Sequence, residues 1–410
     1  MGVGIESINA YFGVAAVGVR ELFGWRGLDL NRFDNLMMER KSVNLPCEDP
    51  VTNAVNAAKP IVDGLDPAER DRIELLIVGT ESGLDFGKSI STYVHHHLGL
   101  SPRCRSFEVK HACYGGTAAL QSAAGIVGSS AVPGVKALAI ATDAPSRAAT
   151  GTYWEPSEGA GAVAMLVSDR PEVLELDPGA NGYHTFEVMD TLRPRVEVDA
   201  VNADLSLLSY LRCLEESYAA YGDRVPGVDI VETFDHLVFH TPFARMVKGA
   251  HRMLLRKLRR ASPAEMEQDF ADRVAPSLRY AIELGNTYSA ALYVALCSLL
   301  DNGAVTAARR VGLFSYGSGC VSEFFSGVVG PASRRAVGER RLGEALAARY
   351  MLTLPEYDAI LERADDRAFG VRDQTFDVEP YAKVYASHVE GRGLLVLDRI
   401  ADYHREYRWS

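Results

Sequence analysis

The sequence predicts an α/β fold made of two similar halves, at residues 1–172 and 173–410. Short runs of apolar residues alternate with helix-like stretches along the chain. Several runs are apolar nearly throughout rather than at every second position, which suits strands covered by helices on both faces. The order of these elements in the first half is then restated in the second. This repeated alternation indicates two α/β units that meet face to face.

In the first half, three helix-like stretches precede a series of strands. We expect helices near residues 17–23, 30–40 and 51–64, with a short charged connection at 66–70. Strands follow at 73–78, 107–109, 137–141 and 162–167. Between the second and third of these strands lies KHACYGGTAALQSAAGIVGSS, which has the composition of a sharp turn and a helix of small residues.

The second half opens on a looser stretch near 177–195 that carries Pro and Gly. A strand at 236–239 ends at His240, and Asn286 opens an apolar helix, as Cys113 does in the first half. A strand at 311–315 then takes the place of 137–141. Beyond residue 331 we expect helices near 341–350 and 355–366, followed by a closing strand and a charged end in a C-terminal extension.

Composition excludes several classes of protein. A net charge of −11 argues against a general nucleic-acid binder, which needs a concentrated basic surface. No apolar stretch is long enough to span a bilayer, and the first residues lack the pattern of a secretory signal. The six cysteines form no CxxC pair and no zinc-like cluster with histidine. We therefore expect a cytoplasmic enzyme with no bound metal and no membrane partner.

Cys113 is the candidate nucleophile, and two interpretations of it are open. A thiol at a helix N-terminus meets positive dipole charge and free N–H groups, both of which favour the reactive thiolate. Free cysteine is also among the most buried residue types, so a structural role is about as frequent. Glu81 and His240 each follow a predicted strand, and Asn286 begins a helix. Ligands of α/β sheets bind at such strand ends. Their common placement favours the nucleophile.

Five segments together resemble the hydroxymethylglutaryl-CoA synthases of the thiolase superfamily. They are GTESGLDFGKS, KHACYGGTAAL, FHTPFARMVKGAHR, LGNTYSAALY and FSYGSGCVSEFFS. The similarity covers nearly the whole chain and is greatest to the branch that installs β-branches in polyketides on carrier-protein thioesters. It implies a thiolase-like fold, with two pseudo-symmetric halves in a layered αβαβα arrangement, and a homodimer.

The resemblance also implies residue roles. Cys113 takes an acetyl group as a thioester, Glu81 removes a proton from its methyl group, and His240 positions the acceptor. Asn286 and Ser318 assist binding of the second substrate. The enolate then attacks a β-ketoacyl thioester, and hydrolysis frees Cys113. The substrates are thioesters on phosphopantetheine or CoA, and no cofactor is implied.

This chemistry sets requirements that can be checked. A methyl proton is weakly acidic, so the base needs a partly desolvated site and a pKa raised towards neutrality. The enolate needs fixed N–H donors. We expect one such donor at Cys113 or in the turn that begins at Tyr316 and includes Ser318.

Residues around this centre are candidates for substrate and partner contacts. Arg245, Lys248 and Arg252 recur at near-helical spacing and suit either a solvated face or a docking surface for donor and acceptor carrier proteins. The segment after Asp143 looks short for the family, and Tyr153 within it is a candidate for the entrance. The histidine run 95–97 cannot direct all its rings at one ion from a helix, so we assign it to a surface or interface.

Three rival functions are open on the sequence. A mevalonate-pathway synthase uses CoA thioesters for both substrates. A ketoacyl-carrier-protein synthase of the chain-priming type shares Cys, His and Asn at corresponding places, but it makes its enolate by decarboxylation and needs no Glu81. A scaffold without activity could dock carrier proteins, and it would not become acetylated on Cys113.

Overall fold

Nine strands form one mixed sheet within residues 2–145 and 147–410, the part of the chain that the computed structural model describes. The strand order is β11-β12-β13-β8-β1-β7-β6-β4-β5. Adjacent strands β1 and β8 belong to different halves of the chain and pair only at Gly4–Glu175 and Ile5–Leu174. This short ladder joins two sheets that are otherwise separate.

The first half contributes the order β1-β7-β6-β4-β5. Its strands are β1 (Gly4–Tyr11), β4 (Ile73–Gly79), β5 (Arg105–Val109), β6 (Lys136–Asp143) and β7 (Gly161–Ser168). Strand β4 lies parallel to β5 and β6, whereas β7 runs antiparallel to β6 and β1. The strands β6 and β7 are buried along their whole length, because helices cover both faces.

The second half repeats this topology in the order β8-β13-β12-β11. Its strands are β8 (Leu174–Thr185), β11 (His236–Phe239), β12 (Arg309–Gly317) and β13 (Val321–Val329). Strand β12 is parallel to β11, and β13 is antiparallel to β12 and to β8. The pairings match those of β6 with β4 and of β7 with β6 and β1. The predicted pseudo-symmetry is therefore confirmed, and the boundary at residue 172 stays a prediction.

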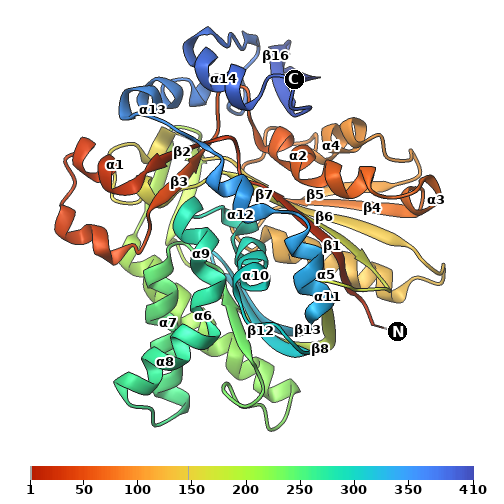
Figure 1. The fold of residues 1–410 in the computed structure, drawn as a ribbon, viewed down its shortest axis with the longest axis vertical. Helices are drawn as coiled ribbons and strands as arrows, with labels where there is room; N and C mark the ends of the chain where they lie inside the picture. Colours follow the sequence, from red (N-terminus) through yellow and green to blue (C-terminus); the bar gives the residue numbers. More distant parts are fainter. Residues whose placement is uncertain (1, 146) are drawn as a thin grey trace.

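Helices form three layers around the two sheets. Helices α5 (Gly115–Ser129) and α10 (Ala291–Asn302) share one buried cluster with the inner faces of both sheets. Helices α2 (Pro50–Asp63) and α4 (Ser91–Leu98) cover the outer face of the first. Helices α6 (Ala203–Arg224), α7 (Ala244–Leu258) and α8 (Pro263–Arg273) cover the second, on the opposite side of the molecule in Figure 1. The layered αβαβα arrangement is confirmed.

The central helices follow from their composition. Helix α5 carries mostly Gly, Ala and Ser, so it fits between two sheets where larger side chains would not. Gly79 at the end of β4 shows how close this packing is, because a Cβ there would lie 2.2 Å from the carbonyl oxygen of Gly115. Helix α10 is apolar on nearly every side and buried throughout its first ten residues, as expected of a core helix.

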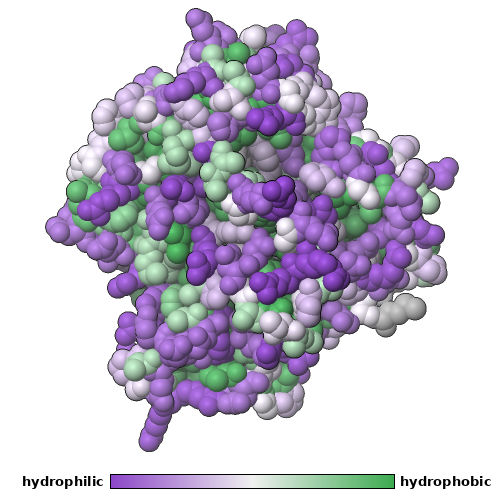
Figure 2. Space-filling model, in the orientation of Figure 1, coloured by the Kyte–Doolittle hydropathy of each residue, from purple (hydrophilic) through white to green (hydrophobic). Residues whose placement is uncertain are grey.

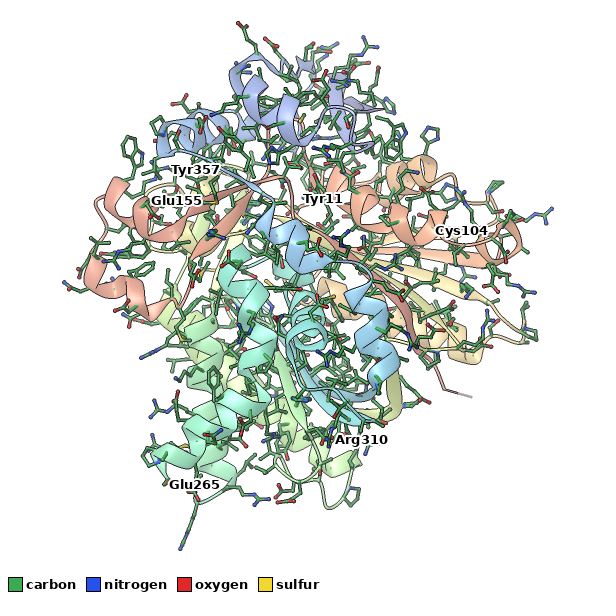
Figure 3. The ribbon with its side chains drawn as sticks, viewed as in Figure 1. Tyr11, Cys104, Glu155, Glu265, Arg310 and Tyr357 are labelled. Atoms are coloured by element: carbon green, nitrogen blue, oxygen red, sulfur yellow. The ribbon has the colours of Figure 1, made fainter. Side chains whose placement is uncertain are left out.

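The C-terminal extension packs back on the first half of the chain. It contains α11 (Pro331–Gly338), α12 (Leu342–Ala347), β14 (Tyr350–Met351), α13 (Leu354–Leu361), β15 (Gln374–Thr375), α14 (Ala382–His388), β16 (Leu395–Ala401) and β17 (His404–Trp409). The buried carboxylate of Asp49 accepts hydrogen bonds from Arg405 and Tyr407. Glu155 and Tyr357, which lie close together in Figure 3, are joined at 3.1 Å.

The remaining described elements lie outside the nine-stranded sheet. They are β2 (Ala15–Gly18), α1 (Val19–Trp25), β3 (Arg40–Val43), α3 (Pro67–Arg70), β9 (Thr191–Arg195), β10 (Val198–Val201) and α9 (Ala275–Leu284), with short 3-10 helices at Leu30–Asn35, Arg147–Ala149, Glu155–Ser157, Tyr288–Ala290, Ala364–Arg367 and Glu379–Tyr381. Hydrophilic residues dominate the face in Figure 2, with hydrophobic ones in small separate areas. None of the described helices could cross a membrane.

Two expected elements differ from the structure. Residues 30–40 form a 3-10 helix over Leu30–Asn35 and enter strand β3, because Asp29 caps only a short turn and Val43 pairs with Ala15 of β2. The stretch near 177–195 is not loose. It contains most of the twelve-residue strand β8, where an irregularity in register against β13 accommodates Pro178 and Gly179. Helix α6 was not predicted.

Candidate active site

Glu81 and Cys113 meet at the carboxyl ends of neighbouring strands. Glu81 comes two residues after β4, and Cys113 lies in the turn between β5 and α5. Their side chains lie side by side, with 3.4 Å between the Sγ atom of Cys113 and the Oε2 atom of Glu81. Ala112, just before the cysteine, has a left-handed φ of 41°, a conformation that non-glycine residues adopt only where the fold requires it. The turn therefore holds the sulfur at the carboxyl group.

Asp143 fixes the loop that carries Glu81. Its carboxylate ends β6, is fully buried, and accepts hydrogen bonds from the backbone N–H groups of Glu81 (2.8 Å) and Ser82 (3.1 Å). The N–H and hydroxyl of Ser289 bind its other oxygen at 3.0 and 2.5 Å. Asp143 thus ties a first-half loop to the segment that leads into α10. Sequence reasoning gave it no role, although an acidic residue ending the run ALAIAT was a usable signal.

The surroundings of Glu81 and Cys113 favour the protonated form of both side chains. Removal from water raises the pKa of Glu81 to about 7, and the negative charge of Asp143 acts in the same direction. The same two causes, burial first and then Glu81 and Asp143, raise the pKa of Cys113 well above its usual value. The expected thiolate is therefore wrong for the resting site, because burial and then the two nearby carboxyl groups raise the thiol pKa despite the helix N-terminus. The expected rise of the Glu81 pKa towards neutrality is confirmed in direction, and the role of Glu81 as the base stays a prediction.

Asn286 reaches the nucleophile from the second half. Its backbone is held by Ser157 and Gly159 at 2.7 and 2.9 Å, and its Oδ1 atom accepts the N–H of Tyr288 at 2.9 Å. A side-chain hydrogen bond from Asn286 to Cys113 lowers the thiol pKa and partly opposes the carboxyl groups. Because this hydrogen bond lowers the thiol pKa, the group that makes it is a donor, which is the amide nitrogen. Three residues predicted for the site are therefore in contact.

His240 lies at the end of β11 as a neutral imidazole. Its carbonyl oxygen accepts the hydroxyl of Tyr210 at 2.8 Å, and its ring stacks on Tyr316 with 6.3 Å between centroids. Burial lowers its pKa to about 3, so the ring carries no charge at neutral pH. Its buried Nδ1 atom has no hydrogen-bond partner among the described residues, and so can meet a ligand.

The turn after β12 is held by a second buried aspartate. Asp190 accepts the hydroxyl of Tyr316 at 2.7 Å and the N–H of Gly319 at 3.0 Å. Both groups are thus engaged within the protein, and Tyr316 offers its ring rather than its hydroxyl to the site. Ser318 lies in this turn. Burial lowers the pKa of His111, and a hydrogen bond with the backbone of Ser318 partly opposes that shift.

The predicted outer residues lie away from the Cys113–Glu81 pair. Tyr153 packs under the guanidinium of Arg32, 4.0 Å from its ring centroid, and against Phe23. Its place is therefore on the surface beside α1, and no described contact joins it to the nucleophile. On α7, the backbone N–H of Arg245 binds the carbonyl oxygen of Leu36, and Lys248 forms an ion pair with Glu267 at 2.5 Å.

The three consecutive histidines at 95–97 lie in the last turn of helix α4. His95 hydrogen-bonds the carbonyl oxygen of Ser101 at 2.9 Å, while His97 packs edge-on against Tyr407 with ring centroids 5.2 Å apart. The rings thus have separate partners at the contact between α4 and the C-terminal strands. Across residues 2–145 and 147–410, His, Cys, Asp and Glu form no cluster of three that could hold a metal ion.

Arg193 and Glu158 complete the charged surroundings, and sequence reasoning missed both. Arg193 in β9 donates from Nε to Asp199 of β10 at 3.0 Å, and its positive charge acts on Glu81. Burial raises the pKa of Glu158 to about 8, although Lys41 opposes the shift. No local motif signals either residue. Residue 146 of the segment after Asp143 lies outside the described residues.

Comparison with known proteins places the chain in one family. Residues 1–171 match the model of the hydroxymethylglutaryl-coenzyme A synthase N-terminal part, and residues 174–268 and 256–405 match the C-terminal part. The chain is 47% identical to the polyketide biosynthesis 3-hydroxy-3-methylglutaryl-ACP synthase PksG of Bacillus subtilis, over 99% of both chains. It is 34% identical to the hydroxymethylglutaryl-CoA synthase of Enterococcus faecalis, over 92% of this chain and 96% of the relative.

Solved structures agree. The HMG synthase of the curacin biosynthetic pathway superposes with a TM-score of 0.96 and 52% identity, over the whole of both chains. Its complex with holo donor-ACP gives 0.97 and 51% over the same extent. MvaS in complex with 3-hydroxy-3-methylglutaryl coenzyme A gives 0.87 and 30%, over 100% of this chain and 99% of that one. The chain therefore belongs to the hydroxymethylglutaryl-CoA synthase family and is an enzyme of that type.

Proposed function

We propose that this enzyme forms a carbon–carbon bond in polyketide β-branching, using thioesters carried on acyl carrier proteins. An acetyl group passes from a donor carrier protein to Cys113, adds to the β-ketone of an acceptor carrier-bound β-ketoacyl thioester, and leaves by hydrolysis. The product bears a β-hydroxy and a β-carboxymethyl group. The observation that carries the proposal is the Glu81 carboxyl group at 3.4 Å from the Cys113 sulfur, with a pKa of about 7.

In the first half-reaction, Cys113 starts as a thiol. Glu81 accepts its proton as the sulfur attacks the donor thioester, and the departing phosphopantetheine thiolate then takes that proton. The amide nitrogen of Asn286, which faces the sulfur, stabilises its developing charge. A group with a pKa near 7 exchanges protons in both directions at neutral pH, which suits a residue that must act more than once.

In the second half-reaction, Glu81 removes a proton from the acetyl methyl group. Because Gly319 N–H is already bound to Asp190, we assign stabilisation of the enolate oxygen to the backbone N–H of Cys113. His240, whose ring is neutral, positions the acceptor ketone, whose oxygen takes up the proton that Glu81 removed and becomes the product hydroxyl. Water then attacks the Cys113 thioester, the carbon–sulfur bond breaks, and the thiol is restored.

The proposal includes two kinds of protein partner. Arg245, Lys248 and Arg252 on α7 would attract an acidic carrier protein, and the pairing of Lys248 with Glu267 is loose enough to exchange, since that carboxylate is 57% exposed. Strand β5 is the last strand on its side of the sheet and leaves an edge open to a second copy of the chain. We therefore propose a homodimer and a carrier-protein surface on α7.

The test is a reconstitution followed by intact-mass measurement. The enzyme is mixed with acetyl-carrier protein and then with a β-ketoacyl-carrier protein. We expect acetyl on Cys113 after the first addition, and one acetyl plus water gained by the acceptor after the second. An acceptor that stays unchanged although Cys113 is acetylated would overturn the proposed condensation. Absence of acetyl on Cys113 would overturn the carrier-protein donor, and acetyl-CoA would then separate a CoA-dependent enzyme from a scaffold without activity.

The mevalonate-type reaction is the second candidate, and the 34% identity to the Enterococcus faecalis synthase favours it. It shares every step at Cys113 and Glu81 and differs in the substrate carriers. Comparing kcat/KM for acetyl-CoA and acetoacetyl-CoA with that for the carrier-bound pair separates the two. We expect the carrier-bound pair to be the better substrates. A higher kcat/KM with the two CoA thioesters would reverse the assignment.

A further inference from the structure

Hydrolysis in the proposed function creates a charge that the starting acetyl group lacks. Water oxygen bonds to the acyl carbon, the carbon–sulfur bond breaks, and Cys113 regains its proton. The product then ends in a carboxylate where the thioester had been, close to the carboxyl group of Glu81. Two carboxylates in a partly dry site repel one another unless a cation or a strong donor is present. The question is which side chain receives the new carboxylate.

Arg193 is the cation that acts on Glu81. It lies in β9, and its Nε atom binds Asp199 at 3.0 Å across the β9–β10 hairpin. Its two outer nitrogens make no hydrogen bond within the described parts of the chain. The side chain is 23% exposed, while that of Asp199 is only 4% exposed. Asp199 therefore anchors one edge of the guanidinium and leaves the other edge, which matches a carboxylate in shape, free for a ligand.

Tyr288 brings a donor to the same place. It follows Asn286, which contacts the nucleophile, and its own backbone N–H fixes the Asn286 side chain. Its φ of 51° is left-handed, a conformation that non-glycine residues adopt only where the fold requires it. The residue is 6% exposed, and its hydroxyl has no partner within ordinary hydrogen-bond geometry among the described residues. A weaker side-chain hydrogen bond joins it to Glu158, and the charges of Glu158, Arg193 and Glu81 act on the phenol.

We propose that Arg193 and Tyr288 bind the carboxylate that hydrolysis creates on the product, Arg193 through its outer nitrogens and Tyr288 through its hydroxyl. This subsite rests on the proposed function and adds to it a place for the product charge. Glu158, which also faces Tyr288, does not compete as an anion at neutral pH, because burial keeps it protonated with a pKa of about 8. The bound carboxylate is held away from Glu81, which favours completion of the hydrolysis.

The alternative is a purely structural role, in which Arg193 stabilises the β9–β10 hairpin through its hydrogen bond to Asp199 and binds no ligand. The two roles differ in ligand preference, so the experiment compares two ligands that differ by one charge. They are hydroxymethylglutaryl-pantetheine, which carries the free carboxylate, and the same molecule with that group as a carboxamide. Each is titrated for its protection of Cys113 against alkylation by iodoacetamide, a measurement that needs no turnover.

We expect the unchanged enzyme to bind the carboxylate at least about tenfold more tightly than the carboxamide, as charge-assisted hydrogen bonds allow. Arg193→Gln and Tyr288→Phe should each reduce this ratio towards one. Arg195→Gln is the matched control, since Arg195 lies in the same strand and is exposed. It should keep the full ratio.

Two results would overturn the subsite: a ratio near one in the unchanged enzyme, or a full ratio in Arg193→Gln. If loss of Arg193 leaves Asp199 unpaired and prevents folding, the double variant Arg193→Gln/Asp199→Asn removes both charges and is measured instead. Failure of the proposed function is seen separately, as an acceptor that gains no mass in the reconstitution. A negative result for the carboxylate subsite would therefore leave the proposed condensation on Cys113 unaffected.

Discussion

At the scale of single residues, the site depends on how carboxyl groups are placed. Glu81 has a raised pKa because it is removed from water and because Asp143 lies beside it. Asp143 in turn tolerates burial because the N–H groups of Glu81, Ser82 and Ser289 bind it. One buried aspartate thus both positions the base and tunes it. Three predictions follow from this pair of carboxyl groups.

Replacing Glu81 separates the two half-reactions. In Glu81→Gln we expect Cys113 to become acetylated, more slowly, because the amide cannot accept its proton. Condensation should fall at least about a hundredfold, since removal of the methyl proton depends on a base at this position. Intact-mass measurement follows the first step and acceptor mass the second. Condensation at the unchanged rate would refute the assignment of the base.

The pH profile should report Glu81. The base acts when deprotonated, so kcat/KM for condensation should rise with pH through about 7 and then level off. Asp143→Asn removes a negative charge and should move this rise to lower pH, as far as the loop stays in place. Asp71→Asn, the same change at an exposed position after α3, is a control that should leave the profile unchanged. A rise that stays at the same pH in Asp143→Asn would show that Asp143 does not tune the base.

Stability should also depend on Glu81. A carboxyl group whose pKa is raised on folding binds its proton more tightly in the folded state, so its contribution to stability is present below pH 4 to 5 and is lost as pH rises through about 7. Glu81→Gln removes this loss. Relative to the unchanged protein, it should be more stable by roughly 3 kcal/mol at pH 8 than at pH 4, since one pKa unit corresponds to about 1.4 kcal/mol. Urea unfolding at the two pH values measures the difference, and equal effects at both would contradict the raised pKa.

At the scale of elements, the spacing between β4 and α5 sets the position of Cys113. Because Gly79 has no side chain, the start of α5 packs directly against its backbone. A Cβ at this position would lie 2.2 Å from the carbonyl oxygen of Gly115. Further along α5, Gly125 has open space around its Cα. Two glycines in one structural unit therefore predict opposite responses to the same substitution.

Gly79→Ala should displace the start of α5 and with it the sulfur of Cys113. We expect a loss of stability of about 2 to 3 kcal/mol, as for overpacked cores, and slower acetylation of Cys113. Gly125→Ala should instead stabilise the protein by about 0.5 to 1 kcal/mol, because alanine favours a helix interior. Thermal unfolding and the acetylation rate are the measurements. Similar behaviour of the two variants would show that the close approach of β4 does not position the nucleophile.

At the scale of the whole molecule, the C-terminal extension closes over the first half. Strand β16 lies against α2, where Asn56 and Leu395 exchange hydrogen bonds, although more than three hundred residues separate them in sequence. Figure 1 shows the C-terminal extension above this helix. The contact is charged and buried, with Asp49 bound to Arg405 at 3.1 Å while the two side chains are 0% and 5% exposed. The same aspartate caps α2 through the N–H of Thr52. This contact joins the end of the chain to the layer that covers the first sheet.

Breaking this pair should be costly. Arg405→Met leaves Asp49 buried with one partner fewer, and we expect a loss of about 3 to 5 kcal/mol. Arg408→Met in the same strand removes a pair with Asp398 whose side chains are 45% and 48% exposed, so stability should change by less than about 1 kcal/mol. Urea unfolding of both variants is the measurement. Equal losses would mean that burial does not distinguish the two ion pairs.

The sequence by itself determined the fold class, the repeated order of elements and the members of the central group. Strand ends at Glu81 and His240 and helix starts near Cys113 and Asn286 are local patterns of apolar runs and turns, so they can be recognised without tertiary information. The five motif segments identified the family. The helix at 30–40 and the loose stretch near 177–195 were wrong, because pairing with β2 and β13 overrides local preference.

Only the tertiary structure decided the chemistry of the site. The protonation of Cys113 depends on Glu81 and Asp143, which lie 32 and 30 residues away in sequence and meet it only across strand ends. Arg193 has no local signature, yet its charge acts on Glu81, more than a hundred residues away in sequence. A pKa is set by every charge and every lost water within a few ångströms. Apolar periodicity along a chain records none of those distances, so sequence predicts which residues gather but not the charge each one carries.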